Sequence, residues 1–168
     1  MIKAALALAI GISAISTASY ATNQWNVNAT SCVADAGSIQ GNLYIGTGGT
    51  VKFANGKTGD IVLYCPVSFK LGFTPSIIGL VYYDDSSSSG NHVTAQLIKM
   101  AMDTGAITSI ITIDSDKGPG TSQGKAAHVA HEFTNTYDPV NFAYYIRIDV
   151  IRNSPTANET VYGVALQD

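Results

Sequence analysis

The sequence predicts an all-β domain, and three observations lead to this prediction. Within residues 141–152, the alternation over 142–151 gives an apolar face and a face that carries Arg147 and Asp149, which is the period of a strand of about ten residues. Of the acidic residues, ten are Asp and two are Glu, and Asp suits turns whereas Glu favours helices. Short apolar runs rich in β-branched and aromatic residues recur between Gly, Pro, Asn and Ser. We therefore expect residues 141–152 to form a central strand, whose buried face carries Tyr144, Ile146, Ile148 and Val150.

The first part of the domain is predicted to form short strands joined by tight turns. Residues 25–30 alternate and carry no charge, so we expect an edge strand there, with Trp25 as a core residue or, alternatively, a sugar platform. Short strands are predicted at 43–45 and 50–53. The glycines at 46–49 between them predict a turn and not a phosphate loop, because no GKS or GKT follows.

Longer strands follow. Strands are predicted at 60–67, 76–84, 93–102, 106–114, 127–134 and 160–166, with exposed loops at 84–91 and 116–124. The apolar phase of 93–102 slips near Leu97, which indicates a bulge or a strand buried on both faces, with a helix as the alternative. In 160–166, Tyr162, Val164 and Leu166 are predicted to share one face. The spacing of these elements predicts a single antiparallel β-sandwich, jelly-roll-like or immunoglobulin-like, over residues 22–168.

The first 21 residues predict a cleaved secretory signal peptide. Lys3 gives a positive start, residues 4–15 form a short apolar run, and residues 19–21 fit a small-x-small cleavage site. An uncleaved membrane anchor is the alternative. We expect a mature chain from Thr22, secreted or at the cell surface, in the periplasm or outside the cell.

Export affects how the two cysteines are interpreted. Cys32 and Cys65 are the only cysteines, and an even count in an oxidising compartment favours a disulfide. Two free thiols or half of a metal site are the alternatives. A catalytic thiol is disfavoured, because Cys65 lies in the apolar run 61–65, where burial raises a thiol pKa.

Charge argues against a nucleic acid partner. The chain has a formal net charge of −3 and no run of Lys or Arg, so it offers no basic field to a phosphate backbone. Only 12% of its residues are charged, so Ser, Thr, Asn, Gly and Tyr must form much of its surface.

Several short motifs together resemble a known group of proteins. They are the Pro66-Val67 step, residues 79–84 before a Ser-rich loop, 93–97, 144–148 and 162–164. Their order resembles small exported bacterial β-sandwich proteins described only as hypothetical secreted proteins. The resemblance implies the fold and an exported location, and it implies no catalytic residue.

Motifs for metal or catalytic chemistry are incomplete. His128 and His131 form an H-x-x-H that a strand would split between two faces, so we expect no metal there. Oxygen-rich loops make candidate calcium ligands of Asp84, Asp85, Asn91, Asp114 and Asp116, with solvated carboxylates as the alternative. No G-x-S-x-G elbow is present and Glu is scarce, so we expect no enzyme and assign no catalytic or cofactor-binding residue.

Two functions of different classes fit these features. The first is an exported, non-enzymatic structural or interaction protein that contacts proteins or glycans at the cell exterior, with a homo-oligomer as one form of that contact. The alternative is a carbohydrate-binding module, assisted by calcium, in which exposed Tyr82, Tyr83 or Tyr145 stack on sugar. An exposed row of aromatics beside polar side chains would favour the second function.

Overall fold

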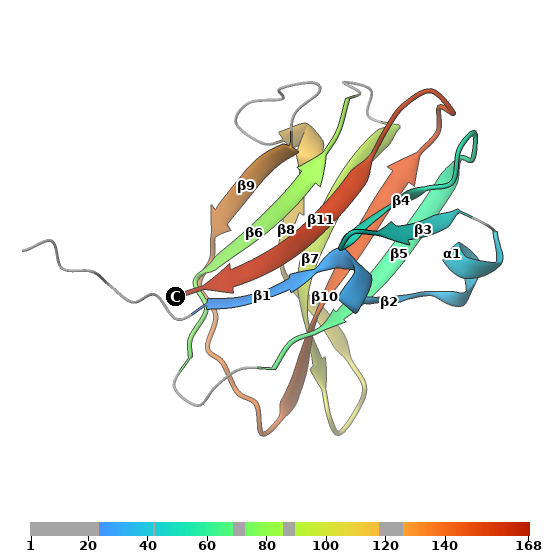
Figure 1. Ribbon diagram of the computed structural model, residues 1–168. Coiled ribbons are helices and arrows are strands. Elements are labelled where there is room, and N and C mark those ends of the chain that lie inside the picture. Colours follow the sequence, from blue (N-terminus) through green and yellow to red (C-terminus); the bar gives the residue numbers. More distant parts are fainter. Residues whose placement is uncertain (1–23, 42, 69–72, 86–89, 118–125) are drawn as a thin grey trace, which may run out of the picture.

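The computed structural model describes residues 24–41, 43–68, 73–85, 90–117 and 126–168, and in them the chain forms two antiparallel sheets packed face to face (Figure 1). The predicted signal peptide lies outside these residues. Sheet A contains β1 (Gln24–Asn28), β3 (Tyr44–Thr47), β4 (Thr50–Phe53), β6 (Ile77–Tyr83), β9 (Ala126–Glu132) and β11 (Thr160–Gln167). Sheet B contains β2 (Val33–Ala34), β5 (Gly59–Pro66), β7 (Asn91–Ala101), β8 (Ile107–Asp114) and β10 (Phe142–Arg152).

The path of the chain is that of a jelly roll. From β4 onward, sheet A has the order β4-β11-β6-β9 and sheet B the order β5-β10-β7-β8. Apart from the step between the paired strands β7 and β8, each step from one of these strands to the next passes to the other sheet. This is the two-sheet, Greek-key arrangement of jelly rolls, so the predicted fold class is confirmed and the jelly roll is the form that the chain adopts.

The predicted central strand is β10, which pairs with β5 on one side and β7 on the other. The predicted inward residues are all buried, and Ile146, Ile148 and Val150 are fully so. They pack in one core with apolar side chains from sheet A, including Leu80 and Leu166. Strict alternation on β10 leaves its other side chains on the outer face of sheet B.

Several predicted details are confirmed. The register of β7 with β8 shifts between Leu97 and Ile98, but the additional residue is Ile110 of β8, so the bulge lies beside Leu97 on the neighbouring strand. Residues 91–101 form a strand, so the helical alternative for this segment is wrong. Gly48 and Gly49 form the tip of the β3–β4 hairpin, with φ of 57° and 85°, so the glycine run is a turn. Trp25 is half-buried and packs against the core, which favours the core alternative for it.

The sequence did not reveal the segment between β1 and β3. The 3-10 turn η1 (Ala29–Ser31), strand β2 and helix α1 (Ala36–Gln40) all lie here. Asp35 caps α1 by accepting a hydrogen bond from the Ser38 backbone N–H at 2.6 Å, and its own N–H donates to the Val62 carbonyl. Another 3-10 turn, η2 (Ser115–Lys117), follows β8.

One predicted face is wrong. The register of β11 with β6 shifts between Val161 and Gly163, and Tyr162 is the additional residue. This β-bulge puts Val161, Val164 and Leu166 into the core and leaves Tyr162 exposed, so Tyr162 does not share a face with Val164 and Leu166.

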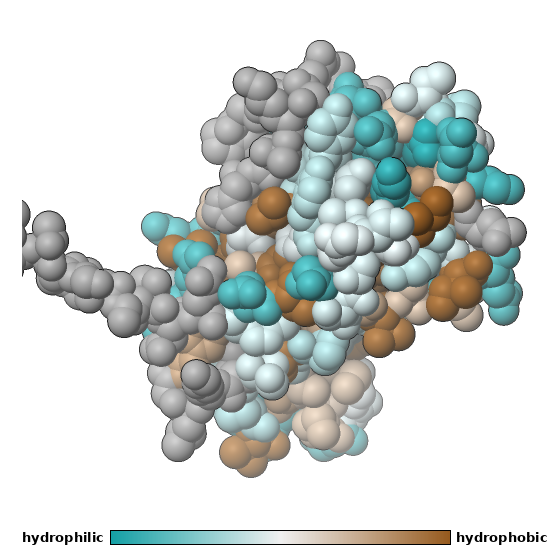
Figure 2. All heavy atoms as spheres, in the orientation of Figure 1, coloured by the Kyte–Doolittle hydropathy of each residue, from teal (hydrophilic) through white to brown (hydrophobic). Residues whose placement is uncertain are grey.

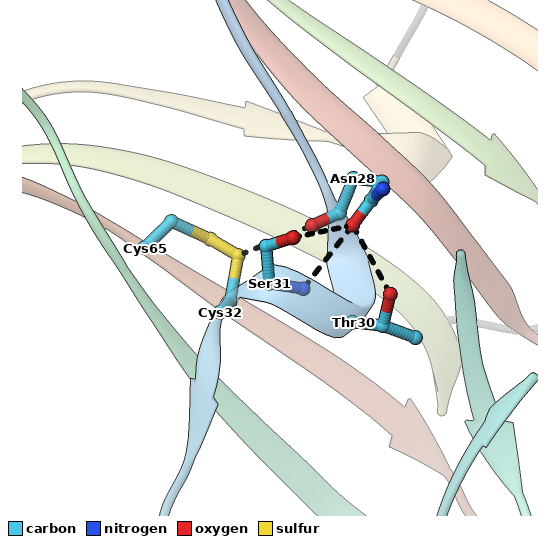
Figure 3. The surroundings of a disulfide bond; sticks show 5 residues. All are labelled: Asn28, Thr30, Ser31, Cys32 and Cys65. Atoms are coloured by element: carbon cyan, nitrogen blue, oxygen red, sulfur yellow. Dashed lines mark hydrogen bonds between the residues drawn. A yellow bond between two sulfur atoms is a disulfide. The ribbon is translucent and has the colours of Figure 1, made fainter.

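The predicted disulfide joins Cys32 to Cys65 (Figure 3). Cys32 follows η1, where the chain passes from β1 of sheet A to β2 of sheet B, and Cys65 is a core residue of β5. Asn28 braces the same turn, because its Oδ1 accepts hydrogen bonds from the Thr30 and Ser31 hydroxyls and the Ser31 N–H. The bridge therefore fixes the place where the chain changes sheets.

No helix within the described residues has the length and apolarity to cross a membrane.

Candidate functional site

The outer face of sheet B carries a row of side chains that crosses the whole sheet. The strand register aligns Val33 (β2), Tyr64 (β5), Arg147 (β10), Gln96 (β7) and Thr112 (β8). All five are exposed or half-buried, because their neighbours along each strand point into the core. With five strands spaced by 4.7 to 4.9 Å, the row is about 19 Å long. We call this row, together with Tyr145, Asp149 and Thr94 beside it, the tyrosine face.

Two tyrosines form the aromatic part of this face. Tyr64 lies opposite Arg147 in the β5–β10 register, and Tyr145 precedes Arg147 by two residues on the same side of β10. The ring centroids of Tyr64 and Tyr145 are 6.0 Å apart and their planes meet at 61°. The rings therefore form a corner, and Tyr64 is 38% exposed to solvent.

Arg147 is held in place beside these rings. Its Nε and Nη2 both donate to Asp149 Oδ1, at 3.0 and 2.7 Å. The hydrogen bond to Asp149 raises the pKa of the Arg147 guanidinium, and burial opposes that change. A charge-assisted pair with two donors restricts the side chain, so the guanidinium forms a fixed donor surface next to the two tyrosines.

The three tyrosines proposed from the sequence have different surroundings. Tyr145 lies on the tyrosine face. Tyr83 is half-buried at the end of β6 in sheet A. Tyr82 is 3% exposed, and its pKa is raised by burial and then by Asp84, Asp116 and Asp114. Tyr82 is therefore a core residue and cannot stack on a ligand at the surface, which corrects the expectation for it.

Tyr64 was not proposed from the sequence, although a signal for it was present. The run 61–65 is apolar throughout, which by itself predicts a buried strand. Its period-two pattern alternates Ile61, Leu63 and Cys65, which are fully buried, with Val62 and Tyr64, which face outward. A large aromatic at the outward phase of a strand with one buried face is the signal that could have identified Tyr64.

The calcium candidates lie where β6, β7 and β8 meet the adjoining loops, and the oxygens of four of them accept hydrogen bonds within the fold, while Asp116 Oδ2 lies 4.0 Å from His92 Nδ1. Asp84 Oδ2 accepts from the Ser115 hydroxyl at 2.7 Å, and Asp85 Oδ1 accepts from the Asn158 N–H at 2.7 Å. Asn91 Oδ1 accepts from two backbone N–H groups of the 153–154 turn. Asp114 Oδ1 accepts from the Asp116 N–H. Among the described residues, no three His, Cys, Asp or Glu side chains are placed to hold a metal, and calcium binding stays a prediction.

The sequence did not predict the buried carboxyl group of Glu159. Glu159 is 1% exposed, and among the described residues neither of its carboxyl oxygens has a hydrogen-bond partner. Arg152 Nε is 4.0 Å from Glu159 Oε2. Burial raises the pKa of Glu159 to about 7, with Asp84 and Asp85 adding to the increase and Arg152 opposing it. A single Glu directly before a predicted strand gives no sequence signal of burial.

The H-x-x-H motif lies on β9, where His128 pairs with Val81 and His131 with Ile78 of β6. The side chain of His131 is half-buried, and that of His128 lies outside the described side chains. Three residues apart on a strand, the two positions belong to opposite faces, as the sequence predicts.

Comparisons with known proteins bear on the fold. No family model matches the chain, and no curated protein does. Among solved structures, one described as the xylan-binding module CBM15 aligns with a TM-score of 0.51 and 12% identity, covering 87% of this chain and 96% of that one. A second, described as the low-affinity xylan-binding module CBM86 from Roseburia intestinalis, aligns with a TM-score of 0.44 and 12% identity, with the same coverage. At this identity, the first of these likenesses concerns the fold alone.

Proposed function

We propose that this protein is an exported, non-catalytic carbohydrate-binding module that holds a polysaccharide chain on the tyrosine face. The observation that carries the proposal is the row of outward side chains across sheet B, in which Tyr64 and Tyr145 stand beside Arg147. A row at right angles to five strands fits an extended chain of sugar units better than a compact small molecule. The alternative drawn from the sequence, glycan binding, thus has more support than a purely structural role.

The chemistry of the face suits a sugar. Pyranose rings have apolar C–H surfaces that pack on aromatic rings, and hydroxyl groups that both donate and accept hydrogen bonds. Tyr64 and Tyr145 supply the aromatic surface, Arg147 supplies donors, and Gln96 and Thr112 supply both donors and acceptors along the same row. Ligand sites of this kind combine apolar area with a few placed polar groups.

Xylan is the first ligand to test. The protein described as xylan-binding module CBM15 shares the sandwich fold at 12% identity, which makes a plant β-glycan a reasonable first probe without fixing the ligand of this chain. A row of about 19 Å also predicts that longer oligosaccharides bind more tightly than disaccharides, because they contact more of the row.

The test is native affinity electrophoresis of the mature chain in gels that contain soluble xylan, mixed-linkage glucan, mannan or no polysaccharide. We expect retardation in at least one gel. Tyr64→Ala should weaken that binding about tenfold or more, since aromatic hot spots at binding sites cost about 2 kcal/mol or more when truncated.

Tyr64→Phe is the matched control. It keeps the ring and should keep most of the retardation, and Ile39→Ala, at a site 58% exposed in α1 and outside the row, should change nothing. Equal migration of the wild-type chain in all gels would contradict the proposal. Hydrolysis of any of these polysaccharides would contradict its non-catalytic part.

A second function has one observation in its favour. Met102, Ile107 and Val140 are each more than 60% exposed, and they gather at one end of sheet B, where the Met102 N–H donates to the Asn141 carbonyl. Exposed apolar residues that gather in one place are typical of protein contacts, so self-association through this end is the alternative. Light scattering across a wide concentration range tests it: a mass that doubles with concentration, and that Val140→Asp returns to a monomer, would support it.

A further inference from the structure

The outer face of sheet A contains a trough with a floor of small residues. One row of the register crosses four strands through Asn26 (β1), Ala165 (β11), Gly79 (β6) and Ala130 (β9). Three of these residues have at most a methyl side chain; Gly79 is buried, Ala165 is half-buried, and the two outer members of the row are exposed. A hollow of about 350 Å³ lies beside it, over β1, β6 and β11. Sheet A is the nearer sheet in Figure 1, and Figure 2 therefore looks onto this face.

A bulge and a glycine build the wall and the floor of this trough. The register shift between Val161 and Gly163 turns Tyr162 outward, where it is 37% exposed and lines the hollow. A Cβ at Gly163 would lie 2.5 Å from the Val27 carbonyl oxygen, so only glycine allows β1 to approach β11 here. The trough is thus a product of the bulged backbone together with the small residues of its floor.

The lining is apolar over the larger part of its area, and its polar side chains carry no charge. Asn26, Asn28 and Gln167 contribute amides and Tyr162 contributes a phenol, and no Lys, Arg, His, Asp or Glu is among the described residues that line the hollow. Three donors occupy the Oδ1 of Asn28, and its amide nitrogen points away from them (Figure 3). Amides and a phenol match hydroxyl groups as both donors and acceptors, whereas an anionic or cationic ligand would find no counter-charge.

We propose that the trough is a second binding site, for a segment of an uncharged polysaccharide. The inference rests on the proposed function, and it adds that the module holds two glycan chains, one on each sheet. The tyrosine face and the trough lie on opposite outer faces of the sandwich, so one extended chain does not reach both. A protein with two such sites cross-links polysaccharide chains, and both sites together hold it on an insoluble wall more firmly than one.

The test is an NMR titration of the ¹⁵N-labelled mature chain with xylohexaose, or with a hexasaccharide of whichever glycan retards it in gels. We expect two sets of backbone amide shifts, one around residues 64 and 145–149 and one around residues 26–28 and 162–167, each with its own dissociation constant. Ala165→Leu fills the trough from its floor and should remove only the second set. Tyr162→Ala removes the wall without filling the floor. It should raise the dissociation constant obtained from the second set of shifts at least threefold.

The outcomes separate the two proposals. Shifts confined to the tyrosine face and unchanged by Ala165→Leu would overturn the second site and leave the proposed function standing. Shifts confined to the trough would overturn the tyrosine face as the site and support this one. Tyr64→Ala should remove the first set alone, and it should abolish the turbidity that the wild-type chain produces with soluble polysaccharide, since a protein with one site cannot cross-link. No shift with any neutral hexasaccharide would overturn both.

Discussion

The two outer faces of the sandwich are built by opposite means. On sheet B, strict alternation along β5 and β10 brings large side chains outward, and Arg147 is fixed to Asp149 beside two tyrosines. On sheet A, a bulge and small residues remove bulk from the surface and leave a hollow beside Tyr162. Along the regular strands β5 and β10, large outward side chains form the surface. Beside the bulge in β11, backbone and small residues form part of it.

The core that both faces share gives the largest expected effect. Ile148 is fully buried at the centre of β10 and packs in the cluster formed by both sheets. Ile148→Ala should lower the free energy of unfolding by about 2 to 5 kcal/mol, through lost burial and the cavity left behind. Urea titration measures this loss. Below the midpoint, glycan affinity should stay unchanged, and a stability change within error would mean that β10 is not central.

The disulfide should distinguish the two faces. It fixes the turn that leads from β1 to β2, and β1 forms one side of the trough. A bridge that closes a separation of 33 residues contributes about 3 to 4 kcal/mol by the loop-entropy relation. The Cys32→Ser, Cys65→Ser variant should lose that much in a denaturant titration. It should also weaken binding in the trough more than on the tyrosine face, and quantitative alkylation of both cysteines in the unreduced, denatured wild-type chain would contradict the bridge.

Gly163 contributes to the trough and not to the tyrosine face. Gly163→Ala places a methyl group against the Val27 carbonyl, which must move, so we expect a loss of about 1 to 3 kcal/mol. Gly37→Ala is the matched control, because its nearest contact is 3.7 Å away and it lies in α1, where Ala is favoured over Gly. Thermal unfolding compares the two variants. Equal melting temperatures would mean that β1 adapts freely to a side chain at residue 163.

The pH dependence of stability should come largely from Glu159, which lies on neither face. Its pKa is raised from 4.5 to about 7, first by burial. Between these two values the unfolded chain releases the proton while the native chain keeps it, so stability falls as pH rises and the loss is complete above 7. The pKa of Asp116, also raised by burial, acts in the same direction.

The melting temperature should therefore be higher at mildly acidic than at alkaline pH. Glu159→Gln, which cannot ionise, should flatten that slope. The pKa values of Asp35 and Asp138 are lowered, mainly by hydrogen bonds from Ser38 and Asn141, so their contribution is lost as pH falls below about 4. A melting temperature that rises from acidic to alkaline pH would contradict the assignment to Glu159.

Regular strands were predictable from the sequence, and irregular ones were not. The period-two pattern of residues 142–152 placed Ile148 in the core and Arg147 and Tyr145 outside, because a strand with one buried face has only one register that hides its apolar side chains. Tyr162 was assigned to the wrong face, because one additional residue in a strand reverses the alternation without changing the composition. Gly163 and Gly79 gave no sign of a trough, since the row that joins small residues runs across strands far apart in the sequence.

The residues of the candidate site also differed in how far the sequence could predict them. Tyr145 could be proposed from its strand, whereas Tyr82, equally aromatic, is buried because it falls on the inward phase of β6. The pairing of Tyr64 with Arg147 depends on strand order, which the sequence does not fix. Of the oxygens proposed for calcium, those of Asp85, Asn91 and Asp114 accept hydrogen bonds from backbone N–H groups of turns.

The most direct test compares Tyr64→Ala with Tyr162→Ala by isothermal titration with the same soluble polysaccharide. If sheet B carries the higher-affinity site, Tyr64→Ala should raise the smaller of the two dissociation constants, that of the tighter phase, about tenfold or more. Tyr162→Ala should leave that dissociation constant unchanged. Both side chains are similarly exposed, so the pair controls for the loss of a surface ring. An unchanged tighter phase in Tyr64→Ala would contradict the account.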